Sequence, residues 1–263
     1  MIGVRLGAGR EADVYAWGGD AVLKLYRPGF GGHRAEATAL AELDGHGLAP
    51  QLIDTVEHDG RAGLVLERLD GTDMLSLLRR QPWRMPGLGR ALAATHLAVH
   101  RVRAPAGLPA LREVVAARIA AAALPPRLRD HARRLLDGLP DGDRLCHGDY
   151  HPGNVLLAAD RIAVIDWPNA ARGAPAADHA RTTLLLRWAD PFPGTPVPVR
   201  ALAAAGRSVL ARGYTRAYRR GAARPARQAH AWLVVHAAAR VSEGIEGERR
   251  TLLAFLDRSR RRR

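Results

Sequence analysis

A Pro/Gly-interrupted loop, C146-H-G-D-Y-H-P-G-N-V-L-L157, carries the polar residues with the clearest chemical use. Asp149 can accept a proton from a hydroxyl group. Asn154 can offer its amide oxygen to a divalent cation, and its position carries weight because the chain has only two asparagines. The next apolar strand, I162-A-V-I-D-W167, ends near Asp166, a carboxylate placed to meet a metal ion at the edge of a sheet. These residue types indicate a metal-assisted reaction with a proton acceptor close by.

Lys24 is the only lysine in the chain, and the other 39 of its 40 Lys and Arg residues are arginines. The Arg/Ala/Gly/Pro-rich composition indicates a bias towards GC-rich codons, under which arginine is the default surface cation. A lysine retained under that bias suits a position where a compact point charge fits and a planar guanidinium does not. Chance retention is the alternative explanation, and the residues around Lys24 distinguish it from a functional requirement for lysine.

The segment G7-A-G-R-E11 places Gly7 and Gly9 between two expected strands. Glycines there let backbone N–H groups approach phosphate oxygens, although most glycine pairs between strands are simple turns. Lys24, on the next strand, would point under this loop, where a triphosphate would lie. Glu36, on the following helix, is the natural carboxylate partner of that amine, although a solvated charge is the commoner role for a helix glutamate.

The secondary structure expected to position these residues changes from mostly strands to mostly helices along the chain. Strands are expected at 2–6, 13–17, 21–26, 51–57 and 61–67, with a helix at 33–43 after the third strand. Beyond Asp70, helices are expected at 88–102, 108–123, 127–136, 176–188, 199–219, 226–242 and 248–258, with short strands around a loop in 143–157 and 161–166. Strands followed by helices predict an α+β fold of two lobes, residues 1–70 and 71–263, joined by a hinge at L69-D-G71.

Together, H147-G-D-Y-H-P-G-N154 and I165-D-W167 resemble the signature of the aminoglycoside phosphotransferase and choline kinase-like family, and the resemblance runs over most of the chain. It implies a bilobal protein-kinase-like fold with a small five-stranded antiparallel N-lobe and a larger helical C-lobe. The implied activity is Mg²⁺-ATP-dependent transfer of the γ-phosphate to a hydroxyl of a small molecule, with GTP as an alternative donor.

The resemblance also implies roles for individual residues. By position, Lys24 resembles the lysine that contacts the α- and β-phosphates beneath the Gly7/Gly9 loop, Glu36 its partner, Asp149 the catalytic aspartate, and Asn154 and Asp166 the Mg²⁺ ligands. In the hinge stretch L66-E-R-L69, the Glu67 carbonyl and the Leu69 N–H would meet adenine. Asp178 resembles a buried aspartate that supports the catalytic loop.

The motif departs from that of regulated protein kinases. His147-Gly148-Asp149 replaces His-Arg-Asp, so no arginine is present there to read a phosphorylated activation loop. Only eleven residues separate Asp166 from Asp178, which leaves little room for a peptide-docking segment. These departures favour a small-molecule acceptor and constitutive activity. His151 could place the acceptor or brace the loop.

Several classes of acceptor are compatible with the sequence. The resemblance suggests an aminoglycoside, but the same family phosphorylates other hydroxyl-bearing antibiotics and metabolites, such as amino alcohols and sugars. In V241-S-E-G-I-E-G-E248, the carboxylates of Glu243, Glu246 and Glu248 could bind amines, or they could serve the N-terminus of the last helix, whose dipole favours acids. The arginine-rich helices instead favour an anionic or neutral acceptor.

Charge and composition bear on partners and compartment. The net charge is −4 for residues 1–70 and +18 for the rest, within a total of +14. A basic tail, R258-S-R-R-R-R263, could touch nucleic acid or an anionic membrane surface, but a solvated helix end enriched by codon bias is the preferred interpretation. There is no signal-peptide pattern and no membrane-length apolar run, and the single Cys146 fits a reducing compartment. A cytoplasmic protein without a membrane partner is expected.

Two functional classes other than a phosphotransferase are possible alternatives: a nucleic-acid-associated protein and a kinase-fold binding protein. A nucleic-acid-associated protein ranks last, because no aromatic-basic interleaving or reader motif is present. A kinase-fold binding protein without transfer activity would have little reason to keep all four of Lys24, Asp149, Asn154 and Asp166. The sequence makes no prediction of oligomeric state.

Overall fold

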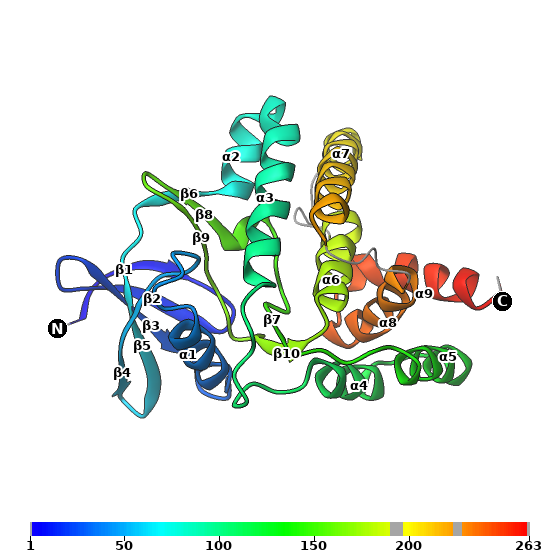
Figure 1. Cartoon of the computed structure of the whole chain (residues 1–263), viewed down its shortest axis with the longest axis horizontal. Helices are drawn as coiled ribbons and strands as arrows, with labels where there is room; N and C mark the ends of the chain where they lie inside the picture. The colour runs from blue at the N-terminus through cyan, green and yellow to red at the C-terminus, as the bar shows by residue number, and fades with distance from the viewer. Residues whose placement is uncertain (1, 190–196, 223–227, 262–263) are drawn as a thin grey trace.

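The computed structural model describes residues 2–189, 197–222 and 228–261. Its N-terminal lobe is a five-stranded antiparallel sheet of order β1-β2-β3-β5-β4, with helix α1 (His33–Glu42) contacting β4 and β5 (Figure 1). The strands are β1 (Ile2–Ala8), β2 (Ala12–Trp17), β3 (Ala21–Tyr26), β4 (Leu52–His58) and β5 (Arg61–Glu67). The predicted five-stranded N-lobe with one helix is confirmed.

Turn chemistry explains the hairpin between β4 and β5. Asp59 and Gly60 form its tip, with φ of 50° and 69°. A two-residue hairpin turn with positive φ at both positions matches the right-handed twist of its strands, and Asp-Gly is a favoured sequence for it. The Asp59-Gly60 sequence therefore accounts for the tight connection between the two strands.

The C-terminal lobe is mostly helical. Its described helices are α2 (Met74–Arg80), α3 (Met85–Val99), α4 (Leu111–Ala121), α5 (Pro126–Asp137), α6 (Pro175–Trp188), α7 (Val197–Gly221), α8 (Ala229–Arg240) and α9 (Glu246–Arg261), with single 3-10 turns η1 (Pro82–Arg84), η2 (Pro152–Asn154) and η3 (Val241–Glu243). Every predicted helix has a counterpart, although residues 226 and 227 of the predicted 226–242 helix lie outside the described residues.

Helix α2 was not predicted. It begins at Asp73, whose carboxylate accepts a hydrogen bond of 2.8 Å from the Ser76 N–H, a standard N-cap.

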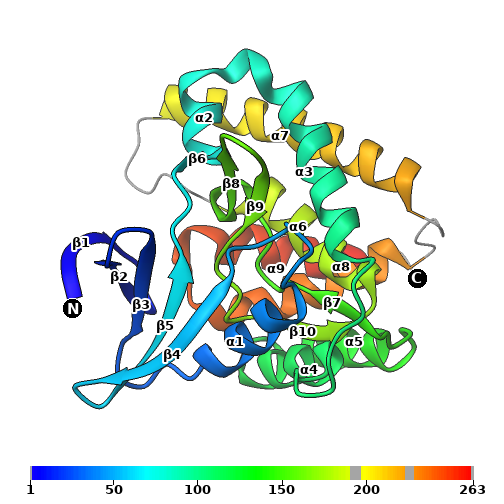
Figure 2. The same cartoon turned by 60° about the vertical axis from the view of Figure 1, so that its left-hand side comes forward.

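Short strands lie between the two lobes. Strands β6 (Gly71–Asp73), β8 (Val155–Ala158) and β9 (Ile162–Val164) form a three-stranded sheet of order β6-β8-β9, and β7 (Arg144–Cys146) pairs with β10 (Ala171–Gly173). Figure 2 shows β8 and β9 between the N-lobe sheet and the C-lobe helices. The loops that leave β7 and β9 carry the signature residues, so these small sheets position the site. Within the described residues, no helix has the length and apolar character needed to span a membrane.

Candidate active site

A cleft of about 1010 Å³ lies between the two lobes and is lined by residues of both. Nine of the predicted site residues line it: Gly9, Lys24, Glu36, Glu67, Leu69, Asp149, Asn154, Asp166 and Glu243. Four residues predicted to contact the nucleotide or the acceptor lie outside this lining: Gly7, His151, Glu246 and Glu248. The structure therefore gathers into one space polar groups that the sequence spreads from the first strands to the start of the last helix.

Lys24 lies at the centre of an ion network on the N-lobe side of the cleft. Its Nζ donates to both carboxylate oxygens of Glu36, at 2.9 and 2.6 Å, and to Oδ1 of Asp166 at 2.7 Å. Glu36 is buried, and its Oε1 also accepts the backbone N–H of Trp167 at 3.2 Å. One carboxylate thus joins α1 to the segment that carries Asp166, and the predicted Lys24–Glu36 pair is present.

Burial and charge oppose each other at Lys24. Burial alone would lower its pKa, but Glu36 and Asp166 outweigh that effect, so the pKa lies above its ordinary value. The amine therefore stays charged at neutral pH. Tyr26, which has no distinguishing signal in the sequence, donates its hydroxyl to Glu36, and its pKa is raised chiefly by burial and by that carboxylate.

Asp166 has a backbone conformation that few residues other than glycine adopt. Its φ is +68°, in the left-handed region. Such strain persists only where the surroundings hold it, and it is concentrated at functional sites. The neighbouring Ile165 N–H donates to the Asn154 carbonyl at 3.0 Å, which ties the Asp166 segment to the Asn154 turn. The two proposed metal ligands therefore come from adjacent chain segments.

The glycine of the His-Gly-Asp sequence has a steric explanation. Gly148 has a φ of +78°, and a Cβ built on it would lie 2.3 Å from the carbonyl oxygen of Asn169. Any side chain at this position, including the arginine of regulated protein kinases, would collide with that backbone. The sequence H147-G-D149 is therefore required by the close approach of the loop that follows Asp166.

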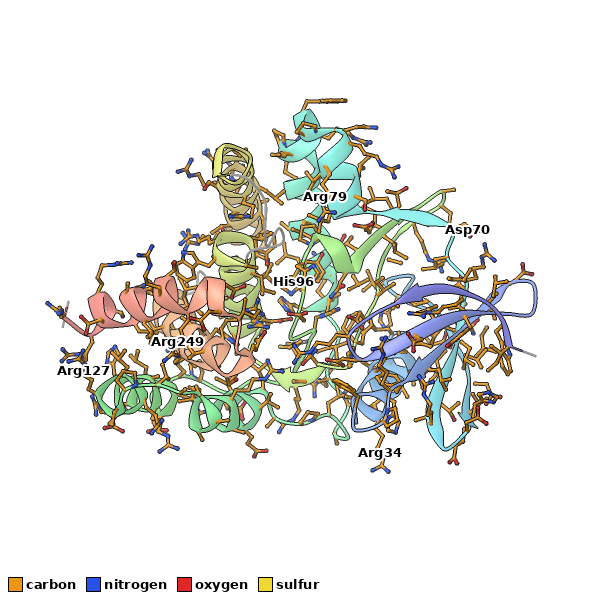
Figure 3. The ribbon with its side chains drawn as sticks, turned by 180° about the vertical axis from the view of Figure 1, so that it is seen from behind. Arg34, Asp70, Arg79, His96, Arg127 and Arg249 are labelled. Carbon is orange, nitrogen blue, oxygen red and sulfur yellow. The ribbon has the colours of Figure 1, made fainter. Side chains whose placement is uncertain are left out.

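Asp178 supports the loop that carries Asp149, as the resemblance implied. Its Oδ2 accepts the His147 N–H at 2.7 Å and its Oδ1 the Gly148 N–H at 3.0 Å. The same carboxylate is 3.1 Å from His96 Nε2 and 3.2 Å from His100 Nε2, and it is fully buried. Figure 3 shows His96 inside the C-lobe. Burial would raise the pKa of Asp178, but the two histidines hold it well below its ordinary value.

Asp149 is held by an arginine that the sequence analysis did not select. Arg181 Nη2, from α6, lies 3.2 Å from Asp149 Oδ1. Burial raises the pKa of Asp149, but Arg181, followed by His151 and His147, outweighs it and leaves the pKa below its ordinary value. Asp149 is therefore ionised at neutral pH and can accept a hydrogen bond from a hydroxyl group.

His151 braces the loop. Its Nδ1 accepts the Gly153 N–H at 3.0 Å and caps the η2 turn, while its Nε2 lies 3.8 Å from Asp149 Oδ2. Burial is the main reason that the pKa of His151 lies below its ordinary value. Of the two roles open for this residue, the geometry supports bracing.

The glycine segment is shorter than expected. Strand β1 continues through Gly7, which pairs with Val14, so Gly7 belongs to the strand and not to a phosphate loop. The turn begins at Gly9, whose N–H donates to the Ala12 carbonyl at 2.9 Å. Glu11, in this turn, also lines the cleft, and its pKa is raised by burial and then by Asp166.

The segment between the lobes lies at the other end of the cleft. Glu67 and Leu69 line it, as predicted. The Glu67 side chain accepts Arg161 Nη2 at 2.6 Å through both oxygens, so the β8–β9 hairpin is bound to the end of β5. Asp70, labelled in Figure 3, marks the connection to β6.

The acidic stretch at 241–248 does not form an amine pocket as a unit. Glu243 lines the cleft, but Glu246 is exposed at the start of α9 and lies outside the lining. Glu248 is buried and binds Arg240 through both oxygens, at 2.8 and 2.9 Å. For Glu246 and Glu248 the geometry favours the alternative role at the start of the last helix, because one is exposed there and the other is paired with Arg240.

Comparisons with known proteins agree with this geometry. The model of the phosphotransferase enzyme family matches residues 3–223. The chain is 37% identical over 175 residues to a hydroxyurea phosphotransferase of Kitasatospora aureofaciens, covering 62% of this chain and 49% of that protein. It is 33% identical over 187 residues to a streptomycin 6-kinase of Streptomyces glaucescens, covering 65% and 56%. The chain therefore spans about half the length of the curated relatives that it matches.

Solved structures share the fold at low sequence identity. A thermostable mutant of the aminoglycoside phosphotransferase APH(4)-Ia superposes with a TM-score of 0.70 and 18% identity, covering 99% of this chain and 94% of that one. A choline/ethanolamine kinase family protein from Mesorhizobium loti gives 0.61 and 17%, covering 99% and 87%. The predicted bilobal, protein-kinase-like α+β fold is confirmed, and the chain belongs to the phosphotransferase enzyme family.

Proposed function

We propose that this protein is a Mg²⁺-ATP-dependent phosphotransferase that moves the γ-phosphate to a hydroxyl of a small molecule. The observation that carries the proposal is the convergence of Lys24, Asp149, Asn154 and Asp166 on one cleft between the lobes. Family membership and the two curated relatives, both named as small-molecule phosphotransferases or kinases, support it. A further related structure, an APH(4)-Ia mutant, holds AMP-PNP and hygromycin B.

The residues present fit a magnesium ion. Mg²⁺ prefers hard oxygen ligands and is bound through one or two carboxylates plus substrate phosphates. Asp166 supplies a carboxylate whose side chain is 45% exposed towards the cleft. The Asn154 amide nitrogen donates to the Asp149 carbonyl at 3.1 Å, which orients its amide oxygen as the atom for a cation. We assign these two side chains to the ion, which when bound would offset charge on the phosphates.

The N-lobe residues would hold the nucleotide. Lys24, fixed by Glu36, presents a point charge for the α- and β-phosphates, and the backbone at Gly9 covers them. The Glu67 carbonyl and the Leu69 N–H would bind adenine, with ATP as the expected nucleotide and GTP as the alternative. In this proposal residues 1–70 form the nucleotide-holding lobe, and residues 71–263 supply the catalytic loop and the acceptor pocket.

Asp149 would orient the acceptor. Its carboxylate accepts the hydroxyl proton as the acceptor oxygen forms a bond to the γ-phosphorus and the bond to the ADP oxygen breaks. The proton resides on Asp149 until it passes to solvent. Because Arg181 keeps the pKa of Asp149 low, Asp149 contributes mainly by hydrogen bonding and positioning, which dominate phosphoryl transfer.

A turnover screen tests the proposal. Mg²⁺-ATP is supplied with aminoglycosides, other hydroxylated antibiotics, amino alcohols and sugars, and ADP formation is measured against an acceptor-free control. Acceptor-dependent ADP release is the expected result, and its class separates an antibiotic kinase from a kinase of metabolites. A protein that transfers no phosphate to any of these acceptors would be a kinase-fold binding protein without transfer activity. A cytoplasmic location is part of this proposal, and the free, buried thiol of Cys146 and the use of ATP support it.

A further inference from the structure

The C-lobe wall of the cleft carries three arginines: Arg118 of α4, Arg181 of α6 and Arg240 at the end of α8. These residues, which we call the arginine wall, come from three different helices and meet beside Asp149. Sequence reasoning did not select them, because 39 arginines leave no local signal. The three arginines differ in their hydrogen-bond and ion-pair partners, and this difference indicates which kind of acceptor could bind to them.

Two members of the arginine wall already neutralise the acids in reach. Arg181 Nη2 lies 3.2 Å from Asp149 Oδ1 and 2.8 Å from Glu243 Oε1. Arg240 binds Glu248 and also contacts Glu243. The Glu243 carboxylate, the acid best placed to receive an amine, is therefore shared between two guanidinium groups. An ammonium group entering here would have to break those pairs and would lie beside the guanidinium of Arg118, which lines the same wall.

Arg118 is the member without a carboxylate partner among the described residues. Its Nη2 donates to a neutral acceptor, Asn169 Oδ1, at 2.7 Å. It is half-buried, and its pKa is lowered chiefly by burial and then by the charge of Arg181. In addition, the buried Arg181 Nε has no hydrogen-bond partner in the described part of the chain. The wall thus holds one guanidinium, that of Arg118, with no carboxylate partner among the described residues, and one unused buried donor, Arg181 Nε.

From this arrangement we propose that the acceptor carries an anionic group, a carboxylate or a phosphate ester, which binds to Arg118 with support from Arg181. The inference rests on the proposed phosphotransfer function and narrows its acceptor class. Guanidinium groups suit this task because their planar forks bind oxyanions through two parallel hydrogen bonds. The hydroxyl to be phosphorylated would then lie on the same molecule, next to Asp149, with Arg118 setting its distance.

The test uses a matched set of acceptors on one polyhydroxylated skeleton: the neutral sugar, its sugar acid, its monophosphate and its amino sugar. For each compound, turnover with Mg²⁺-ATP and calorimetric binding to the MgADP-loaded protein are measured. The variants are Arg118→Gln, Arg118→Lys and a control, Arg133→Gln, which removes an exposed cation from α5 outside the cleft. Thermal melting establishes that each variant is folded.

The expected result is that the acid or the monophosphate has at least tenfold higher kcat/KM than the neutral sugar, with the amino sugar lowest. The two anionic arms tell a carboxylate from a phosphate. Arg118→Gln should lower kcat/KM for the anionic acceptor by roughly 10- to 100-fold, mostly through KM, which is the worth of a charged hydrogen bond. Arg118→Lys should recover part of this loss, and Arg133→Gln should resemble the wild type.

Three outcomes would overturn the inference while Mg²⁺-ATP binding, and with it the proposed function, stands. One is a preference for the amino sugar. Another is an equal loss in Arg118→Gln for anionic and neutral acceptors, which would place Arg118 on the transferring phosphate. The third is that no anionic compound is either bound or phosphorylated. Failure of the proposed function looks different, because Mg²⁺-ATP itself would not bind.

Discussion

The Nζ atom of Lys24 lies 2.7 Å from Oδ1 of Asp166, although 142 positions separate the two residues in the sequence. One belongs to the N-lobe sheet and the other follows β9 of the opposite lobe. Glu36 completes the arrangement, because it binds Lys24 and the Trp167 N–H that follows Asp166. The amine therefore connects both lobes at the place where phosphates and a metal ion would meet.

Lys24→Arg should impair nucleotide binding although it keeps the charge. The ammonium is enclosed by two carboxylates at 2.6 and 2.7 Å, a space that suits a point charge and crowds a planar fork. We expect at least a tenfold weaker affinity for Mg²⁺-ATP in calorimetry. The matched control is Arg34→Ala, an exposed cation on α1 at the outer edge of the molecule in Figure 3. If Lys24→Arg binds Mg²⁺-ATP like the wild type, the lone lysine is a chance survivor of codon bias.

Asp149→Ala should lower kcat by roughly 10²–10⁴, the usual contribution of a positioned proton acceptor. The KM for ATP should change little, because Asp149 faces the acceptor. Steady-state kinetics with the acceptor found by the turnover screen measure both constants. Near-normal turnover would remove Asp149 from this role.

Arg181→Gln should move the acidic limb of the pH–rate profile. Arg181 lowers the pKa of Asp149, so its removal raises that pKa, and a higher pH is then needed to ionise the carboxylate. The limb of kcat/KM should therefore shift to higher pH, in addition to any loss of rate. A purely structural role for Arg181 would reduce the rate without displacing the limb.

Gly148→Ala should distort the catalytic loop. The added Cβ would lie 2.3 Å from the Asn169 carbonyl at a φ of +78°, and such strain costs on the order of 1–3 kcal/mol of unfolding free energy. Urea unfolding and turnover measure the effect. The control is Gly87→Ala in α3, where a Cβ meets nothing within 4 Å and a stabilisation of about 0.4–1 kcal/mol is expected. Similar stabilities for the two variants would contradict the steric explanation.

Buried histidines should make the fold sensitive to acid. Burial lowers the pKa of His96, His179 and His236 to about 3, so the folded protein keeps them neutral. The unfolded chain protonates them below about pH 6.5, so stability falls as the pH decreases from 6.5 towards 3. Each contributes a slope of about 1.4 kcal/mol per pH unit. The depressed pKa of Asp178 acts in the same direction, but only below about pH 4.

Urea titrations at pH 7.5, 6.0 and 5.0 measure this slope. His236→Leu removes one titrating group, whose Nε2 has no hydrogen-bond partner among the described residues, and replaces it with an apolar side chain. Its unfolding free energy should depend less steeply on pH than that of the wild type. Parallel curves for the two proteins would show that His236 does not contribute.

The sequence was most informative where residue type was scarce. A single lysine and two asparagines marked Lys24 and Asn154, and the strand-then-loop pattern marked Asp149 and Asp166, all of which the structure brings to one cleft. Apolar periodicity predicts helices such as α5, which buries one face, whereas α6 and α8 are buried through runs of consecutive residues and offer no such pattern.

The site residues that the sequence could not predict are those whose roles depend on long-range contacts. Arg118, Arg181 and Arg240 resemble every other arginine until three helices bring them together. Arg181 had one faint signal, since it follows Asp178 by three residues and so lies near it on α6. From the sequence, Glu248 could be an amine ligand. Its actual partner, Arg240, becomes apparent only when α8 and α9 pack together.

In the proposed function, Asp166 and Asn154 hold a metal ion that binds ATP together with Lys24. Calorimetric titration of ATP, with and without Mg²⁺, tests it in the wild type, in Asp166→Ala and in Asp160→Asn, a control at an exposed carboxylate six residues away. We predict that the wild type and Asp160→Asn bind ATP only when Mg²⁺ is present, and that Asp166→Ala binds at least tenfold more weakly. ATP binding that ignores Mg²⁺, or that survives the loss of Asp166 unchanged, would contradict the account.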